Sequence, residues 1–294
     1  YDKILNIDNC DLQLNMANDI FNFIKLECIN NNLKPYDIKN HHGFLRHLMI
    51  RYGINTNEIM VNFVTSIEKP KLLKPIAKKL IKKFPNIKSI VNNINTRKAD
   101  MTFGEWEINL EGENYIIEKL GDYEFEISAN SFFQTNTLQT EILYKIISKE
   151  CNLKGDEIVY DLYSGIGSIS IFMSKNVKSI YGIELIETAV NDAKKNAIRN
   201  NIQNAHFYCG DLKDFIIKNK KKFTLPNPDI IIIDPPRLGM HRNTIKDVIK
   251  TNAKKIIYCS CNPSTQVRDL NEFTNYGYKI KKIRPIDMFP NTPH

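Results

Sequence analysis

The spacing of apolar residues divides the chain into two parts with different expected architectures. Up to about residue 130, helix-like spacing is mixed with the every-second-residue alternation of half-buried strands. The predicted helices run from Leu14 to Leu26 and from Lys71 to Phe84, and the predicted strands cover residues 44–51, 58–65 and 87–94. Between residues 105 and 127, the turn sequences at 111–114 and 121–122 predict hairpins.

After residue 130, short apolar runs alternate regularly with helical segments of about ten to fifteen residues. The apolar runs are residues 158–160, 179–183, 206–208, 230–233, 256–258 and 278–283. Residues 230–233 are consecutive isoleucines, which is typical of a buried parallel strand. We therefore expect an α/β protein, with a smaller α+β domain at residues 1–130 and a Rossmann-like domain with a doubly wound sheet at residues 131–294.

The composition of the chain indicates which class of partner and which cellular compartment to expect. The 294 residues are 42% hydrophobic and 25% charged, and no apolar run approaches the ~20 residues of a membrane span. Nothing at the start resembles a secretory signal, and the six cysteines form no Cys-x-x-Cys pair, so we expect a cytoplasmic protein with free thiols. We also expect a monomer. The net charge of +8 suits a nucleic acid, although the lysine-rich runs 78–83 and 218–222 are each more typical of solvated surface.

Polar residues follow the predicted strands of the second domain, at the edge where such sheets bind ligands. After the first strand come Tyr163, Gly165 and Gly167, and glycines allow a sharp turn and a close approach to a ligand. A third glycine, as in dinucleotide-binding loops, is missing, which disfavours a pyrophosphate. Glu184 ends the second strand, where a carboxylate either caps the next element or accepts hydrogen bonds from ribose hydroxyls. Together the loop and the carboxylate favour a nucleoside ligand.

Two further carboxylates follow the third and fourth strands. Asp211 is placed either to meet an adenine amino group or to cap the next helix. Asp234 opens the run Asp234-Pro235-Pro236-Arg237, whose prolines stiffen the loop. This carboxylate either faces a cofactor or substrate, or belongs to a rigid turn.

Cys261 stands at the carboxyl end of the fifth predicted strand, directly before Asn262 and Pro263. Free cysteines are usually small buried apolar residues. That interpretation suits Cys28, Cys151, Cys209 and Cys259. Cys261 differs because it lies at the ligand-binding edge, and no other cysteine or histidine near it has the spacing of a metal site. We expect a nucleophilic thiol and no metal.

Four motifs occur together in the chain. They are Phe132-Phe133-Gln134-Thr135-Asn136, the segment 161–167, Asp234-Pro235-Pro236-Arg237-Leu238-Gly239, and Ser260-Cys261-Asn262-Pro263. With them the sequence resembles the RNA uracil-C5 methyltransferase family, which forms 5-methyluridine in tRNA and large-subunit ribosomal RNA. The resemblance covers most of the chain, is strongest from Ser131 onward, and implies a class I S-adenosylmethionine-dependent methyltransferase domain.

The resemblance also implies roles for individual residues. The residues implied to contact S-adenosylmethionine are Gln134, Tyr163, Glu184 and Asp234, with Asp211 as an addition. Cys261 is implied to be the nucleophile, because thiolate addition at C6 of uracil makes C5 reactive enough to take a methyl group. The implied partner is RNA, ribosomal RNA rather than tRNA, bound by the first domain and basic edges of the second. Without the resemblance, residues 132–134 would be interpreted as a hydrophobic staple.

Two family features have no complete match in these residues. The family's proton-abstracting glutamate stands in a Pro-x-Thr-x-His-Val-Glu motif, and the sequence reaches only Pro290-Asn291-Thr292-Pro293-His294. We expect that glutamate beyond His294, and we expect a chain without it to stall as a covalent adduct. Some members also bind an iron–sulfur cluster, for which Cys10 matches only the last ligand, so we expect no cluster here.

Three alternatives stay open at this point. An RNA cytosine-C5 methyltransferase would carry its nucleophile in an Asp-x-Pro-Cys loop, where this chain has Arg237. An exocyclic-amine methyltransferase would share the Asp-Pro-Pro sequence but need no thiol. A non-catalytic RNA-binding factor would bind RNA with a steep salt dependence and turn over no cofactor.

Overall fold

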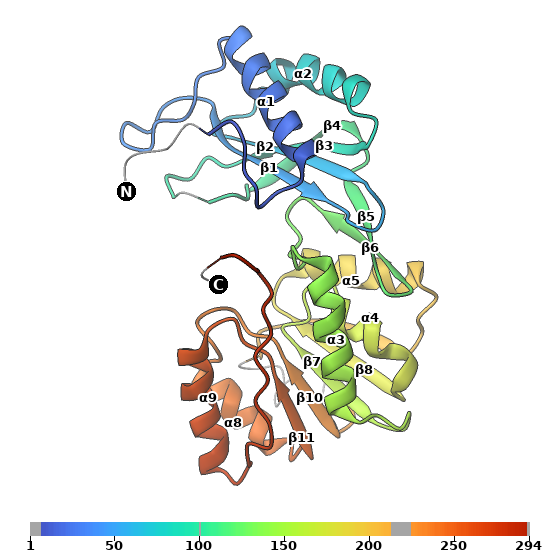
Figure 1. Cartoon of the computed structure of the whole chain (residues 1–294). Helices are drawn as coiled ribbons and strands as arrows, with labels where there is room; N and C mark the ends of the chain where they lie inside the picture. The colour runs from blue at the N-terminus through green and yellow to red at the C-terminus, as the bar shows by residue number, and fades with distance from the viewer. Residues whose placement is uncertain (1–6, 100, 213–224, 293–294) are drawn as a thin grey trace. The chain divides into compact units, whose positions relative to one another are not determined.

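The computed structural model describes residues 7–99, 101–212 and 225–292 (Figure 1). The chain divides into two compact units, Tyr1–Glu118 with Ile127–Asn130, and Lys119–Glu126 with Ser131–His294. Residues 119–126 therefore group with the second unit, although the sequence placed them before the boundary at residue 130. Among the helices of the described ranges, none combines the length and the apolar character that a bilayer crossing needs.

A four-stranded sheet with two helices forms the first unit (Figure 1). Its elements are α1 (Asn15–Asn30), β1 (Leu45–Tyr52), β2 (Ile59–Thr65), α2 (Pro70–Lys83), β3 (Ile87–Ile94) and β4 (Trp106–Gly112). The order is β1-β2-β3-β4, with β2 and β3 parallel and the other pairs antiparallel. A parallel pair needs a crossover connection, and α2 supplies it. Ile20 of α1 and Leu73 of α2 share a core with Phe63 of β2.

The predicted helices and strands of this unit occur close to their expected positions, but the environment of β2 differs. The sequence suggested alternating exposure over residues 58–65, whereas every residue of β2 is buried. The strand lies between β1 and β3, and both of its faces are covered. The basic run 78–83 lies on α2, where the exposed Lys79 pairs with Glu27 at 2.7 Å. The second basic run, residues 218–222, lies outside the described residues.

One expected hairpin is wrong. Residues 111–114 do not fold β4 back onto β5 (Tyr115–Leu120), because β4 pairs with β3 and β5 pairs with β6 (Tyr123–Ser128). Gly112 is still paired with Ser89, and the next amide, of Glu113, donates to the carbonyl of Lys88 at 2.8 Å. The chain therefore follows β3 through this turn. Of the two turns expected between residues 105 and 127, the one at Gly121-Asp122 joins two paired strands, β5 and β6.

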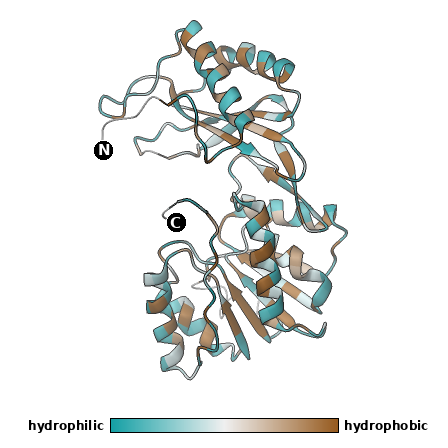
Figure 2. Ribbon diagram, in the orientation of Figure 1, coloured by the Kyte–Doolittle hydropathy of each residue, from teal (hydrophilic) through white to brown (hydrophobic). Residues whose placement is uncertain are grey.

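The second unit is a five-stranded parallel sheet in the order β11-β10-β7-β8-β9 (Figure 1). Its strands are β7 (Ile158–Leu162), β8 (Ser179–Glu184), β9 (Ala205–Cys209), β10 (Ile230–Ile233) and β11 (Lys255–Tyr258). Its helices include α3 (Thr137–Cys151), α4 (Ser168–Met173), α5 (Glu187–Arg199), α8 (Arg242–Lys250) and α9 (Pro263–Asn275). Figure 2 shows hydrophobic residues along these strands, and the isoleucines of β10 are all buried. The Rossmann-like fold predicted from the sequence is confirmed.

Helices cover both faces of this sheet. Ile231 and Ile233 of β10 share a core with Val248 of α8 and Phe273 of α9. On the opposite face, Asp161 of β7 contacts Ser170 of α4 through hydrogen bonds. The strand order reverses between β7 and β10, since the chain adds β8 and β9 on one side and then β10 and β11 on the other.

The prediction of a sixth strand in the second domain is wrong. Residues 278–283 form no strand, and Ile280 and Ile283 are 52% and 74% exposed. The segment is fixed through side chains instead: the Tyr278 hydroxyl donates to the Ala253 carbonyl at 2.8 Å, and Lys282 pairs with Glu150 at 2.6 Å. A lysine-rich segment whose apolar side chains stay in solvent gains little from strand pairing.

We predict that Leu73→Ala lowers the unfolding free energy by about 2–5 kcal/mol, because Leu73 is 0% exposed and its truncation leaves a cavity. Leu72 is the matched control, since it is 43% exposed and its truncation should cost less than about 1 kcal/mol. Urea titration of both variants measures the difference. Equal losses would contradict the packing of α2 described here.

Candidate active site

Parallel pairing brings the carboxyl ends of the five strands to one edge of the second unit's sheet. Tyr163 follows β7, Glu184 ends β8, Asp211 follows β9, Asp234 follows β10 and Cys261 follows β11. The edge includes the reversal of strand order between β7 and β10, where open α/β sheets bind ligands.

The loop after β7 has an unusual backbone. Tyr163, Gly165 and Gly167 all have positive φ, of 65°, 53° and 79°. Gly167 permits close packing, since a Cβ there would lie 2.7 Å from the ring of Phe207. At Gly165 a Cβ would meet no atom of the described residues within 4 Å, so those residues leave space beside this part of the loop. The loop therefore presents backbone rather than side chains toward that space.

Glu184 joins this loop to the end of β8. Its Oε2 accepts a hydrogen bond from the Gly165 amide at 3.0 Å, and its Oε1 accepts from the Leu185 and Ile186 amides at 2.8 and 3.0 Å. A carboxylate has about four acceptor positions. Amides of the described residues thus use three of them, and one position on Oε2 is not among those three.

Tyr163 lies among carboxylates from three different elements. Burial raises the pKa of its phenol to about 12, and the charges of Asp269, Asp211 and Glu184 act in the same direction. Asp211 itself is exposed and follows Gly210, whose amide donates to the Glu184 carbonyl at 2.9 Å. The edge is therefore acidic around this tyrosine.

Asp161 lies on β7, and Asp234 directly follows the neighbouring strand β10. Asp161 is 0% exposed, and its Oδ2 accepts from the amide and hydroxyl of Ser170 at 3.1 and 2.7 Å. Its Oδ1 is buried and has no hydrogen-bond partner among the described residues. Burial raises the pKa of Asp161 to about 7, and Asp234 adds to the rise. Burial also raises the pKa of Asp234 to about 6. Asp161 was not among the expected site residues, although a carboxylate inside an apolar strand is a signal for such a site.

The Cys261 thiol is exposed, in contrast to those of Cys28 and Cys151, whose pKa values burial raises to about 11 and about 12. Burial also raises the pKa of the Cys259 thiol well above its ordinary value. The expectation that Cys209 is a buried core residue is wrong. Cys209 is exposed, and its Sγ donates to the Leu185 carbonyl at 3.4 Å. Cys209 ends β9, which lies at an edge of the sheet and has a neighbouring strand on one side only.

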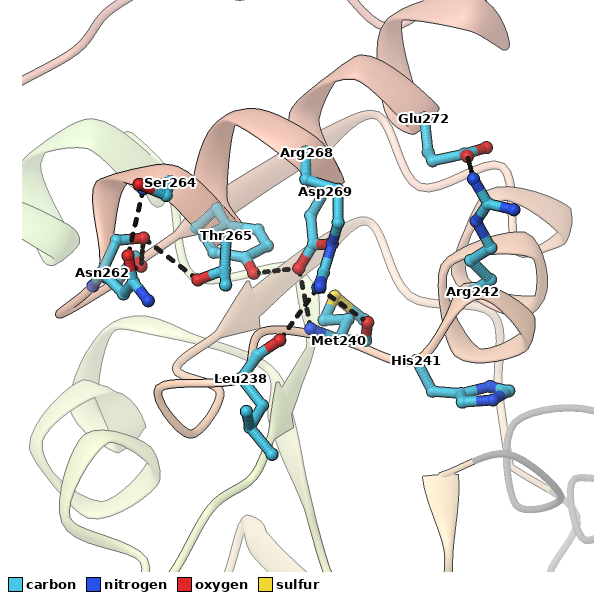
Figure 3. Close-up of polar contacts among 12 residues, drawn as sticks. Leu238, Met240, His241, Arg242, Asn262, Ser264, Thr265, Arg268, Asp269 and Glu272 are labelled. Atoms are coloured by element: carbon cyan, nitrogen blue, oxygen red, sulfur yellow. Dashed lines mark hydrogen bonds and ion pairs between the residues drawn. The ribbon is translucent and has the colours of Figure 1, made fainter.

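The turn that carries Cys261 is held by its neighbours, of which Asn262 and Ser264 are labelled in Figure 3. The Asn262 amide donates to the Ser260 hydroxyl at 3.0 Å, and the Asn262 side chain accepts from the Ser264 amide at 3.1 Å, which caps α9. The Asn262 Nδ2 also donates to the Arg237 carbonyl at 3.1 Å. This bond joins the Cys261 turn to the loop that begins at Asp234.

Gln134 is the one expected site residue that does not follow a strand of this sheet. It is half-buried in the segment before α3, whose N-cap is Asn136. The neighbouring Phe133 is buried, and its ring centroid lies 5.7 Å from that of Phe125. Phe132 is 70% exposed. Within the described ranges, no group of three or more His, Cys, Asp or Glu residues is arranged to hold a metal ion.

The fold is that of class I S-adenosylmethionine-dependent methyltransferases. The family model described as tRNA (Uracil-5-)-methyltransferase matches residues 105–294. The chain belongs to this family.

Relatives and a solved structure agree with that assignment. Proteins named as uncharacterized RNA methyltransferases from Chlorobaculum tepidum and Oceanobacillus iheyensis are 39% and 40% identical over 100% and 98% of this chain. The chain spans 61% and 62% of their lengths, about three-fifths. The crystal structure of Pyrococcus abyssi tRNA (uracil-54, C5)-methyltransferase in complex with S-adenosyl-L-homocysteine matches 99% of this chain and 68% of that chain, with 32% identity and a TM-score of 0.82.

We predict that Asp161→Asn changes how stability depends on pH. The folded-state pKa of Asp161, about 7, is above its unfolded value, so its stabilising contribution is full at low pH and is lost as pH rises toward 7. Between pH 5 and 8 the wild type should therefore lose about 2 kcal/mol of unfolding free energy relative to the variant. Denaturant titrations at several pH values measure this difference. Parallel pH profiles would contradict a raised pKa at Asp161.

Proposed function

We propose that the protein transfers a methyl group from S-adenosylmethionine to C5 of a uridine in RNA, with Cys261 as the covalent nucleophile. The observation that carries this proposal is an exposed thiol at the same sheet edge as a glycine loop and the acceptor Glu184. Membership of the uracil-5-methyltransferase family supports the choice of base and ring position.

The residues at the edge fit the cofactor. The described residues leave space beside Gly165, and the acceptor position of Glu184 that none of their amides uses suits a ribose hydroxyl. Asp211, exposed after β9, is proposed to meet the adenine amino group. The remaining cofactor contacts are assigned to Gln134, Tyr163 and Asp234. When bound, S-adenosylmethionine supplies the methyl group as an electrophile.

The proposed reaction begins at Cys261. Its thiolate forms a bond to C6 of uracil, and the electrons of the C5–C6 double bond move onto the ring as an enolate. C5 then forms a bond to the methyl carbon while the sulfonium–methyl bond breaks. A base removes the C5 proton, the Cys261–C6 bond breaks, and the C5–C6 double bond re-forms. Asp234 is proposed to face the uracil ring, with burial raising its pKa to about 6.

RNA is the proposed partner, and large-subunit ribosomal RNA is the proposed substrate. The net charge of +8 favours a polyanion. The target uridine must leave its stack to reach the edge of the sheet, as base-modifying enzymes require. Mapping of the modified position separates ribosomal RNA from tRNA, which is the substrate in the name of the Pyrococcus protein.

We predict that Cys261→Ala abolishes covalent trapping by RNA containing 5-fluorouridine. Fluorine at C5 cannot be removed as a proton is, so an adduct formed in the presence of S-adenosylmethionine accumulates and needs no later base. Denaturing gel electrophoresis and mass spectrometry of the protein–RNA adduct measure the effect, and we expect a loss of at least about 100-fold.

Cys209→Ser is the control for this experiment, because Cys209 is a second exposed thiol at the end of a strand of the same sheet. It should keep trapping within about threefold of wild type. Trapping that survives Cys261→Ala, or that shifts to Cys209, would refute the assigned nucleophile.

We predict that Glu184→Gln weakens binding of S-adenosylhomocysteine by roughly tenfold or more, because a hydrogen bond to a charged acceptor is worth about 1.5–3 kcal/mol. Glu187→Gln makes the same charge change three residues later, on the exposed first turn of α5, and should leave the affinity nearly unchanged. Isothermal titration calorimetry compares the two. Equal losses would assign the effect to general charge rather than to Glu184.

A further inference from the structure

A buried carboxylate on α9 connects the loop that starts at Asp234 with the strand that leads to Cys261 (Figure 3). Asp269 is 1% exposed. Its Oδ2 accepts hydrogen bonds from the Met240 amide at 2.7 Å and from the Tyr258 hydroxyl at 2.6 Å. Met240 directly follows the loop that Asp234 begins, and Tyr258 is the last residue of β11. One oxygen atom therefore holds both segments.

The second oxygen of Asp269 orients a guanidinium onto the same loop. Oδ1 accepts from Nε and Nη2 of Arg268 at 2.8 and 2.7 Å. Nη2 of Arg268 in turn donates to the carbonyls of Leu238 and Met240 at 2.9 and 3.2 Å. We call Tyr258, Met240, Arg268 and Asp269 the Asp269 network. It fixes backbone donors and acceptors on both sides of Gly239.

The tip of the loop is shaped to allow this approach. Gly239 has a φ of +72°, and a Cβ there would lie 2.6 Å from both Arg268 Nη2 and Asp269 Oδ2. Glycine is the residue that tolerates both the positive φ and the close contact. At the other end of the network, Asn262 and Thr265 donate to the Arg237 carbonyl at 3.1 and 3.2 Å. Helix α9 thus binds the loop along its length while its own first turn follows Cys261.

We propose that Asp269 is a positioning residue for methyl transfer, whose carboxylate fixes the Asp234 loop relative to the Cys261 turn. Asp269 acts through Met240, Tyr258 and Arg268 and touches neither RNA nor cofactor. Because covalent attack needs the thiol and the ring held within a fraction of an ångström, loosening this network lowers the rate of bond formation more than it lowers binding. The inference rests on the proposed function and names a further residue that it needs.

Asp269→Asn tests the proposal, since it keeps the shape of the side chain but removes its charge and sets an amide against Arg268. At saturating 5-fluorouridine RNA and S-adenosylmethionine, we expect the rate constant of adduct formation to fall roughly 10- to 100-fold. The half-saturating RNA concentration and the affinity for S-adenosylhomocysteine should stay within about twofold.

Glu272→Gln is the matched control on the same helix. Glu272 pairs with Arg242 at 3.5 Å, away from the loop tip (Figure 3), so its loss should leave the adduct rate within about twofold of wild type. Arg268→Gln is the second variant, because the Arg268 side chain is 50% exposed and can be shortened without leaving a buried cavity. It should also slow adduct formation. In the double variant with Asp269→Asn, the fold-decrease in the adduct-formation rate should be smaller than the product of the two single fold-decreases, since both residues act on one loop.

The outcomes separate this proposal from the one on which it rests. If the wild type forms no adduct, the proposed function fails. If the wild type forms the adduct but Asp269→Asn and Arg268→Gln react as fast as Glu272→Gln, the positioning role is refuted. A parallel loss of cofactor affinity and rate would also refute it, because it would indicate a general structural role. If Asp269→Asn does not fold, the Arg268→Gln rates decide the matter.

Discussion

The parallel pairing of β10 with β7 determines where the candidate active site of this protein lies. Ile230 pairs with Val159 and Ile233 with Leu162, so the chain returns beside β7 after it has built β8 and β9 on the other side. Because all five strands are parallel, their carboxyl ends share one edge. Residues far apart in the sequence, from Tyr163 to Cys261, follow strands that end at that edge. The buried isoleucines of β10 supply the apolar contacts that hold this arrangement.

Carboxylates at the edge are held by backbone amides and hydroxyls rather than by cations alone. Glu184 accepts hydrogen bonds from three backbone amides, and Asp161 accepts hydrogen bonds from Ser170. Asp269 accepts hydrogen bonds from the Met240 amide and the Tyr258 hydroxyl as well as from Arg268. Such bonds place negative groups accurately and leave their remaining acceptor positions for ligands. The chain as a whole is cationic, with a net charge of +8. This combination suits an enzyme that attracts a polyanion by its overall charge and orders a cofactor by local acidic groups.

Local pattern was enough to predict the two helices of the first unit, the five strands of the parallel sheet and the polar residues that follow them. The errors concern features that depend on distant partners. Residues 278–283 have the apolar content of a strand but form none, and residues 111–114 form a turn whose preceding strand stays on β3. Cys209 is exposed because β9 is an edge strand. Asp269 was missed because its partner is a backbone amide 29 residues away. Asp269 lies four residues before the buried Phe273 on α9, and this spacing was the available signal that Asp269 is on the buried face of the helix.

The most direct test of the account is the identity of the methylated nucleoside. The full-length protein and its Cys261→Ala variant would be incubated with labelled S-adenosylmethionine and unmethylated cellular RNA, and the digested nucleosides identified and mapped by mass spectrometry. The account predicts label in 5-methyluridine, at a defined site, only when Cys261 is present. Label that persists in the variant, or that appears in 5-methylcytidine or on an exocyclic amine, would contradict it.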